Sequence, residues 1–194
     1  MFKWLRNKMK NFEYCKYTYL HRRALLHYIQ KNQYLTNDEK IILIERAKVH
    51  DMDKMTLYFF REKGKASKYH REHSTHHIKH WKVFSEYDLL ESIFDYECAA
   101  LTKPDKPLNA YDTVLAYYAD FKNDYLPILE RLHMDESYLA VDEDDKKYIE
   151  KFLPQEADII SEIQSYLIQS NDVLYKQLWS DLCSEKEYRD LKFW

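Results

Sequence analysis

The stretch VHDMDK, residues 49–54, brings an imidazole, a carboxylate and an ammonium group close together in the chain. His50 directly precedes Asp51, and Lys54 follows shortly after, where the apolar run IILIERAKV has ended. Ionisable groups at the end of a buried helix need charged partners or a metal ion. An adjacent His-Asp pair can place two ligands on a metal site, whereas a capped helix end without metal is the alternative.

His21 is a second candidate ligand. It falls in a predicted helix over residues 11–32, and its neighbours at helical spacing are apolar or aromatic, namely Tyr17, Ala24, Leu25 and Tyr28. His21 is therefore expected to face the core, either as a metal ligand or as a hydrogen-bonded core histidine.

A histidine-rich stretch, KYHREHSTHHIKHW, holds five of the nine histidines of the chain: His70, His73, His76, His77 and His80. If residues 67–82 form one helix, steps of about 100° place all five side chains within an arc of about 120°. The stretch thus predicts a single histidine-bearing face, which suits metal ligation and also suits a polar groove.

Asp95 is the last candidate ligand in chain order. A predicted helix over residues 86–101 aligns four groups at spacings of three and four, namely Asp88, Glu91, Asp95 and Cys98. The order along the chain is an inward histidine, a His-Asp pair, a histidine-rich stretch and an inward aspartate. That order favours a metal site over four unrelated features.

The elements that must position these groups are predicted to be helices. The 194-residue chain has one glycine and four prolines, too few turn residues for a fold of many β-hairpins. A single glycine, Gly64, also excludes a phosphate-binding loop and a dinucleotide-binding glycine turn. Hydrophobic residues make up 45% and charged residues 32%, as in soluble globular proteins. The fold class is therefore predicted to be all-α.

Local patterns set the expected helix bounds. Thr36 and Glu39 have the spacing of a capping box, which predicts a helix over 37–50, and its apolar residues surround it as in a central buried helix. The segment REKGKAS around Gly64 is predicted to be a loop. A further helix is expected over 110–131.

The C-terminal part contains helical patterns but no chemical motif. We predict a metal-binding helical domain over residues 1–134 and a helical extension over 135–194 that packs on it. The extension begins with the acidic segment DESYLAVDEDDKK, whereas residues 1–36 are basic. This asymmetry predicts pairing between the two ends or an anionic partner, and a protein partner for the acidic part.

Three features of the sequence bear on the cellular compartment of the protein. Cys15, Cys98 and Cys183 are odd in number and far apart, which is typical of reduced thiols in the cytoplasm. No apolar run reaches the length of about 18 residues that a transmembrane helix needs. The basic opening MFKWLRNKMK is predicted to form the first turns of a helix rather than a membrane or nucleic-acid contact.

The order His21, His50-Asp51, Asp95 resembles that of the HD superfamily of metal-dependent phosphohydrolases, and HDMDK is similar to its HD-x-x-K segment. The segments HDMDK, YHREHSTHHIKHW and ESIFDYECAA also resemble an uncharacterised family of small bacterial and phage HD-like proteins. The resemblance covers roughly residues 17–102. It implies an HD-domain-like helical bundle with additional C-terminal helices.

The resemblance also implies a ligand set for one or two divalent ions, Mn, Zn, Fe or Mg. The first ion would be held by His21, His50, Asp51 and Asp95. Asp51 would bridge to a second ion held by His70 and by His76 or His77. Lys54 would contact a phosphate oxygen, a role that suits an ammonium group, and a metal-activated water would attack phosphorus.

Three functions remain open from the sequence. The first is hydrolysis of a nucleotide or another small phosphoester, with Asp51 and Lys54 as catalytic residues. The second is oxidation by a mixed-valence di-iron centre, because the myo-inositol oxygenase group uses a similar ligand set on an HD-like fold. The third is non-catalytic binding of a nucleotide or protein. Lys54 favours the first, and the oligomeric state does not follow from the sequence.

Overall fold

The computed structural model describes residues 11–81, 83–102, 108–138 and 142–184, and the predicted N-terminal turns at 1–10 lie outside them. All regular structure in these ranges is helical, which confirms the all-α prediction. The helices are α2 (Phe12–Lys31), α3 (Asn37–Val49), α4 (Met52–Phe60), α5 (Lys63–His73), α6 (Glu86–Thr102), α7 (Ala110–Tyr117), α8 (Lys122–Arg131), α9 (Glu143–Glu150), α10 (Glu156–Gln169) and α11 (Val173–Ser184), with short 3-10 turns η1 (Ile78–His80) and η2 (Ala119–Phe121).

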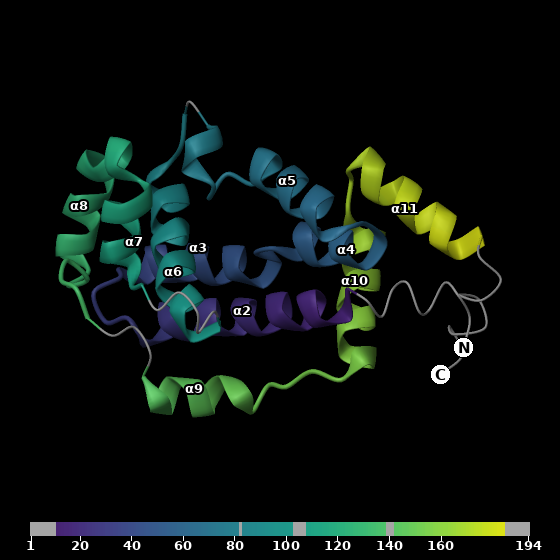
Figure 1. Cartoon of the computed structure of the whole chain (residues 1–194), viewed down its shortest axis with the longest axis horizontal. Coiled ribbons are helices and arrows are strands. Elements are labelled where there is room, and N and C mark those ends of the chain that lie inside the picture. Colours follow the sequence, from purple (N-terminus) through teal and green to yellow (C-terminus); the bar gives the residue numbers. More distant parts are fainter. Residues whose placement is uncertain (1–10, 82, 103–107, 139–141, 185–194) are drawn as a thin grey trace.

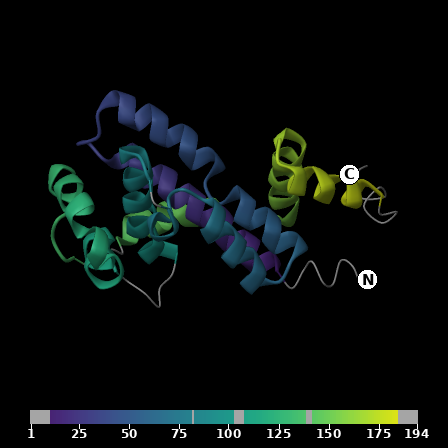
Figure 2. The same ribbon diagram turned by 90° about the horizontal axis from the view of Figure 1, so that it is seen from above.

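Two long helices, α2 and α6, form the centre of the fold and pack against each other. The helix pair α7 and α8 lies towards one end of α2, and the pair α10 and α11 lies towards the other end (Figures 1 and 2). One apolar cluster joins α6 to α2, α3, α7 and α8, and a second joins the N-terminal half of α2 to α4, α5, α10 and α11. The C-terminal helices therefore share a core with the helices that carry the predicted ligands.

The central buried helix is α6, so the prediction that residues 37–50 occupy this place is wrong. Along α3, Ile41 and Val49 are 62% and 61% exposed, whereas Leu43 and Ala47 are buried. Consecutive apolar residues are spread round a helix, so only one face of α3 can meet α2 and α6. The predicted capping box is present, with the Thr36 hydroxyl accepting from the Glu39 amide.

The histidine-rich stretch is not one helix, which corrects the prediction for 67–82. Helix α5 begins already at Lys63, includes Gly64, and ends at His73. Ser74 then adopts an extended conformation, and its carbonyl accepts a hydrogen bond from the Trp81 indole. The chain therefore turns back after α5, and the later histidines reach the site from a separate segment.

Two further bounds differ from the predictions. The predicted helix 110–131 is interrupted after Tyr117, and the ring of Tyr118 stacks on that of Tyr96 with centroids 4.9 Å apart. The Tyr118 ring thus packs against α6, and the helix does not continue through this residue. The helix α4, which directly follows the His-Asp pair, is not among the predicted elements.

The acidic and basic ends of the chain pair with each other in part. Asp145 of α9 accepts hydrogen bonds from Lys31 at 2.8 Å and pairs with the His27 ring at 2.7 Å. The ring of Tyr148 stacks on His27 with centroids 4.2 Å apart. Part of the acidic segment therefore fixes α9 to α2, and a protein partner for the remainder stays a prediction.

Candidate metal centre

The corner between α3 and α4 presents His50 and Asp51 to the same point. His50 ends α3, and Asp51 has the left-handed backbone angles φ 56° and ψ 11° before α4 begins. Aspartate tolerates this conformation better than most residues. On a continuous helix adjacent side chains would diverge by about 100°, whereas here His50 Nε2 and Asp51 Oδ1 lie 3.7 Å apart.

The first group of candidate ligands joins three helices. His21 of α2 places Nε2 2.7 Å from Asp95 Oδ1 of α6, and His50 Nε2 lies 3.8 Å from the same oxygen. The ligand atoms of these three residues lie within 4.8 Å of one another. His21 and His50 are 1% and 3% exposed. The inward orientation predicted for His21 is thus what the structure shows.

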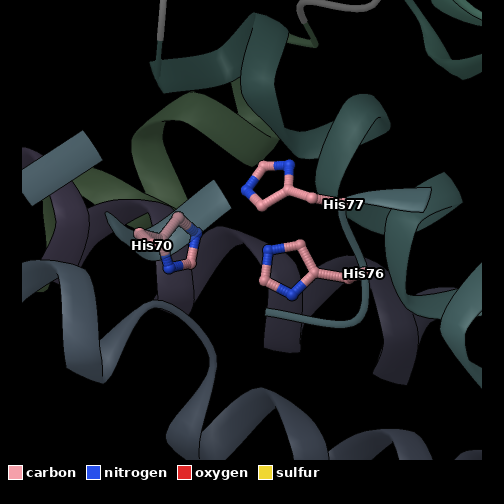
Figure 3. Close-up of side chains that lie close together, drawn as sticks. All are labelled: His70, His76 and His77. Atoms are coloured by element: carbon pink, nitrogen blue, oxygen red, sulfur yellow. The ribbon is translucent and has the colours of Figure 1, made fainter. Parts of the chain in front are cut away.

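The second group consists of His70, His76 and His77. Figure 3 shows the three rings directed towards one another, with His70 on α5 and the adjacent pair on the segment that follows it. Their ligand atoms also lie within 4.8 Å of one another. His76 and His77 both contribute, because the turn after Ser74 releases them from the helical geometry that would separate them.

Asp51 and His76 connect the two groups. His50, Asp51 and His76 form a third set of ligand atoms within 4.8 Å. Asp51 Oδ1 lies 2.7 Å from His70 Nε2 and 3.7 Å from His76 Nε2. The structure therefore brings all seven predicted ligand residues into one buried cluster, with the Asp51 carboxylate between its halves.

Carboxylates outside the cluster orient the histidines. His50 Nδ1 lies 2.7 Å from Glu91 Oε1, and His70 Nδ1 lies 2.8 Å from Asp53 Oδ2. Glu91 in turn accepts from Arg46 Nε at 2.5 Å. When Nδ1 donates to a carboxylate, Nε2 keeps its lone pair for a metal ion. This is the usual second layer of a histidine metal site.

Neither Asp53 nor Glu91 was predicted to be a functional residue. Asp53 lies within the quoted HDMDK segment, and Glu91 lies one helical turn before Asp95. Helical spacing thus contained a signal for Glu91. Two other histidines of the stretch, His73 and His80, are exposed and do not belong to the ligand sets.

Several buried ligand atoms have no hydrogen-bond partner among the described residues. They include His50 Nε2, His76 Nε2 and His77 Nε2, whereas Asp51 Oδ1 and His70 Nε2 face each other at 2.7 Å without regular hydrogen-bond geometry. Buried polar atoms are almost always paired, and each exception requires an explanation. Unpaired imidazole nitrogens and a carboxylate oxygen that converge on one point fit a divalent cation, which prefers these donors.

The ionisation of the cluster suits a cation. Burial raises the pKa of the Asp51 carboxyl, but the charges of Lys54, His70 and His50 outweigh it and hold this pKa well below its usual range. Burial lowers the pKa of His76 to about 4 and, together with His76 and His70, lowers that of His77 to about 2. An ionised carboxylate and neutral imidazoles are the forms that bind metal.

His70 behaves differently. Burial lowers its pKa, but Asp51 and Asp53 together raise it to about 9. Without a metal ion, a proton on His70 therefore balances part of the negative charge on the two carboxylates. A divalent cation would displace that proton, because metal ions bind the neutral imidazole.

Lys54 contacts Asp51 directly. Its Nζ atom lies 2.6 Å from Asp51 Oδ2, and its side chain is 16% exposed. Burial lowers the pKa of Lys54, but Asp51 outweighs this effect and raises it above the usual range. The ammonium group thus neutralises the bridging carboxylate, and its predicted contact with a phosphate oxygen stays a prediction.

A cavity of about 630 Å³ opens beside the cluster. Its wall at the metal end includes His50, Asp51 and His76, and Lys54 is not among the described residues that line it. Further wall residues are Tyr69 and His73 of α5, Tyr166 of α10, Tyr175 of α11, and Asp172, which directly precedes α11. No role was predicted for Tyr166, Asp172 and Tyr175, because they lie far from the ligands in the chain.

Fold and site together define an all-α protein with a buried histidine and aspartate cluster that can hold metal ions. Comparison with protein-family models, with curated proteins and with solved structures found no match. Within the described ranges, no helix combines the length and apolar character that crossing a membrane requires.

Proposed function

We propose that the chain is a metal-dependent phosphohydrolase that acts on a nucleotide or another small phosphoester. The observation that carries the proposal is the convergence of buried Nε2 and Oδ1 atoms that form no hydrogen bond of regular geometry within the described structure. They border a cavity large enough for a small organic ligand. The chain order of His21, His50-Asp51 and Asp95 supports membership of the HD superfamily as part of this proposal.

His21, His50 and Asp95 would hold one ion, and His70, His76 and His77 would hold a second, with Asp51 between them. Bound divalent ions supply an acidified water and stabilise negative charge on a phosphoryl group. Manganese, zinc, iron and magnesium remain candidates, and the histidine-rich ligand set favours zinc and iron.

The protein groups contribute orientation and charge balance. Glu91 and Asp53 hold the rings of His50 and His70 with Nε2 towards the centre. Lys54 offsets the charge of Asp51, so this carboxylate remains ionised in the protein interior. The substrate phosphate would approach through the cavity at His50, Asp51 and His76.

Cys15, Cys98 and Cys183 form no disulfide bond within the described residues, which supports a cytoplasmic location as part of the proposal.

The test is a screen of phosphoesters and nucleotides with protein loaded with manganese, zinc or iron, with and without oxygen. We expect phosphate release that needs metal and ignores oxygen. Lys54→Ala should lower this activity about tenfold, equivalent to about 1.4 kcal/mol of transition-state stabilisation. Lys48→Ala is a suitable control, because Lys48 pairs with Glu45 on the surface.

Oxygen consumption by an iron-loaded protein would contradict hydrolysis and support a di-iron oxygenase. Tight nucleotide or protein binding without any turnover would instead support a non-catalytic role. Zinc or magnesium in the natively purified protein would exclude the oxygenase, because only a redox-active ion supports oxygen chemistry.

A further inference from the structure

The C-terminal helices contribute to the wall of the cavity beside the metal cluster. Tyr166 lies in α10, Asp172 precedes α11, and Tyr175 lies in its first turn. The edge of the Tyr166 ring meets Tyr175, with centroids 5.2 Å apart. Tyr175 packs in the apolar cluster shared with α4 and α5. The corner between α10 and α11 is therefore fixed against the helices that carry the site.

Tyr175 carries an unsatisfied polar group at this wall. The residue is 3% exposed, and its hydroxyl has no hydrogen-bond partner of normal geometry in the described part of the chain. A buried hydroxyl without a hydrogen-bond partner destabilises the folded protein unless a ligand or a water molecule pairs with it. The Tyr175 hydroxyl and the acidic residues of the wall together indicate that the cavity binds a molecule.

The charges of the cavity wall limit what that molecule can be. Four carboxylates line the cavity, namely Asp51, Asp53, Glu91 and Asp172. Arg46 is the one lysine or arginine among the described lining residues, and its guanidinium already pairs with Glu91 and Asp88. The cluster can hold cations at the metal end, whereas Asp172 and the tyrosines offer hydrogen-bond acceptors and aromatic rings.

We propose that the corner formed by Tyr166, Asp172 and Tyr175 binds the leaving group of a phosphate monoester, and that it selects leaving groups that donate hydrogen bonds and carry no negative charge. The inference rests on the proposed phosphohydrolase function. Asp172 would accept hydrogen bonds from hydroxyl or ammonium groups of the ligand. The Tyr175 hydroxyl would form a hydrogen bond with the same ligand. A second phosphate on the substrate would meet the carboxylates, and like charges placed together disfavour binding.

The test measures affinities of ligands with a carbon–phosphorus bond, which resist hydrolysis, for the metal-loaded full chain by calorimetry. One ligand is the methylenephosphonate analogue of adenosine monophosphate, and a second is the same analogue with an added 3′-phosphate. A third, 3-aminopropylphosphonate, presents an ammonium group, and inorganic phosphate reports the metal end alone. Tight binding of the first ligand would identify hydroxyl donors, and tight binding of the third would identify an ammonium group.

We expect the added 3′-phosphate to weaken binding about tenfold, since the proposal places the leaving group that carries it beside Asp172. Asp172→Lys should remove most of this penalty, whereas Asp181→Lys should not, because Asp181 is an exposed residue of the same α11 that does not line the cavity. Tyr175→Phe should weaken the monophosphate analogue roughly threefold. Binding of inorganic phosphate should be the same in all these variants.

Equal affinity for the two adenosine ligands, or an unchanged ratio in Asp172→Lys, would overturn the proposed selectivity while leaving the hydrolase intact. Failure of inorganic phosphate to bind the metal-loaded protein would remove the hydrolase and this inference together. The phosphate measurement therefore distinguishes the two failures.

Discussion

His70 Nε2 lies 2.7 Å from Asp51 Oδ1, although the other nitrogen of His70 already contacts Asp53. A histidine between two carboxylates must either carry a second proton or share the space with a cation. Metal–ligand bonds to nitrogen and oxygen of about 2.1 Å allow two ligand atoms to approach this closely. The pair therefore marks the point where metal binding, proton release and the charge of Asp51 are coupled.

Substitution of Asp51 should remove bound metal. Its Oδ1 atom lies between both histidine groups, so Asp51→Asn should lower metal affinity more than about 100-fold, and Asp51→Ala at least as much. The asparagine variant also tolerates the left-handed backbone at this position. Elemental analysis after dialysis checks the outcome, with Asp181→Asn as control. Equal metal content in Asp51→Asn and the parent would place the metal elsewhere.

Glu91→Gln should weaken metal binding without removing a ligand. The carboxylate orients His50 and pairs with Arg46, and loss of such an outer contact lowers affinity by roughly 10- to 100-fold. Competition with a chelator measures this change. Glu86→Gln is the matched control, because Glu86 lies on the same helix but is exposed. A control that loses as much affinity would argue against an orienting role.

Lys54→Met should destabilise the metal-free protein more than the metal-loaded protein. Breaking a buried ion pair costs about 3–5 kcal/mol, and Asp51 would then keep only histidine rings as partners for its charge. In the loaded protein, metal ions would balance Asp51 instead. Thermal unfolding with and without metal gives the two differences, and Lys48→Met controls for loss of a surface lysine. Equal losses in both states would show that Lys54 and metal do not share Asp51.

The contact between α9 and α2 should depend on pH through Asp145. Burial raises the pKa of this carboxyl, but hydrogen bonds from Lys31 and His27 outweigh it and lower the pKa. A lowered folded-state pKa gives stability that is present above the unfolded value of about 3.9 and is lost as pH falls through the folded value.

Asp145→Asn should therefore lower the melting temperature of the metal-free protein at neutral pH, and the deficit should shrink below about pH 4. Asp144→Asn is the control, since Asp144 is exposed beside it. A deficit that is constant with pH would assign the effect to packing rather than to charge.

Local sequence patterns determined the helical fold and the chemical type of the site. The capping box of Thr36 and Glu39 is confirmed because both partners lie within one turn. The helices predicted at 11–32 and 86–101 match α2 and α6 to within a residue at each end. The inward orientation of His21 could be predicted because it interrupts an otherwise apolar helical face. The ligand set of His21, His50, Asp51 and Asp95 came from the resemblance of their chain order to that of the HD superfamily.

Long-range packing decided the remainder. His21 and Asp95 are 74 positions apart in the chain, and helical periodicity does not specify which helices meet. The left-handed corner at Asp51, the turn after Ser74 and the burial of α6 in place of α3 all arise from contacts between elements. Tyr175 enters the cavity only because α11 folds back onto α4 and α5. Side-chain chemistry is a local property of sequence, whereas convergence on one point depends on the energy of the whole packed chain.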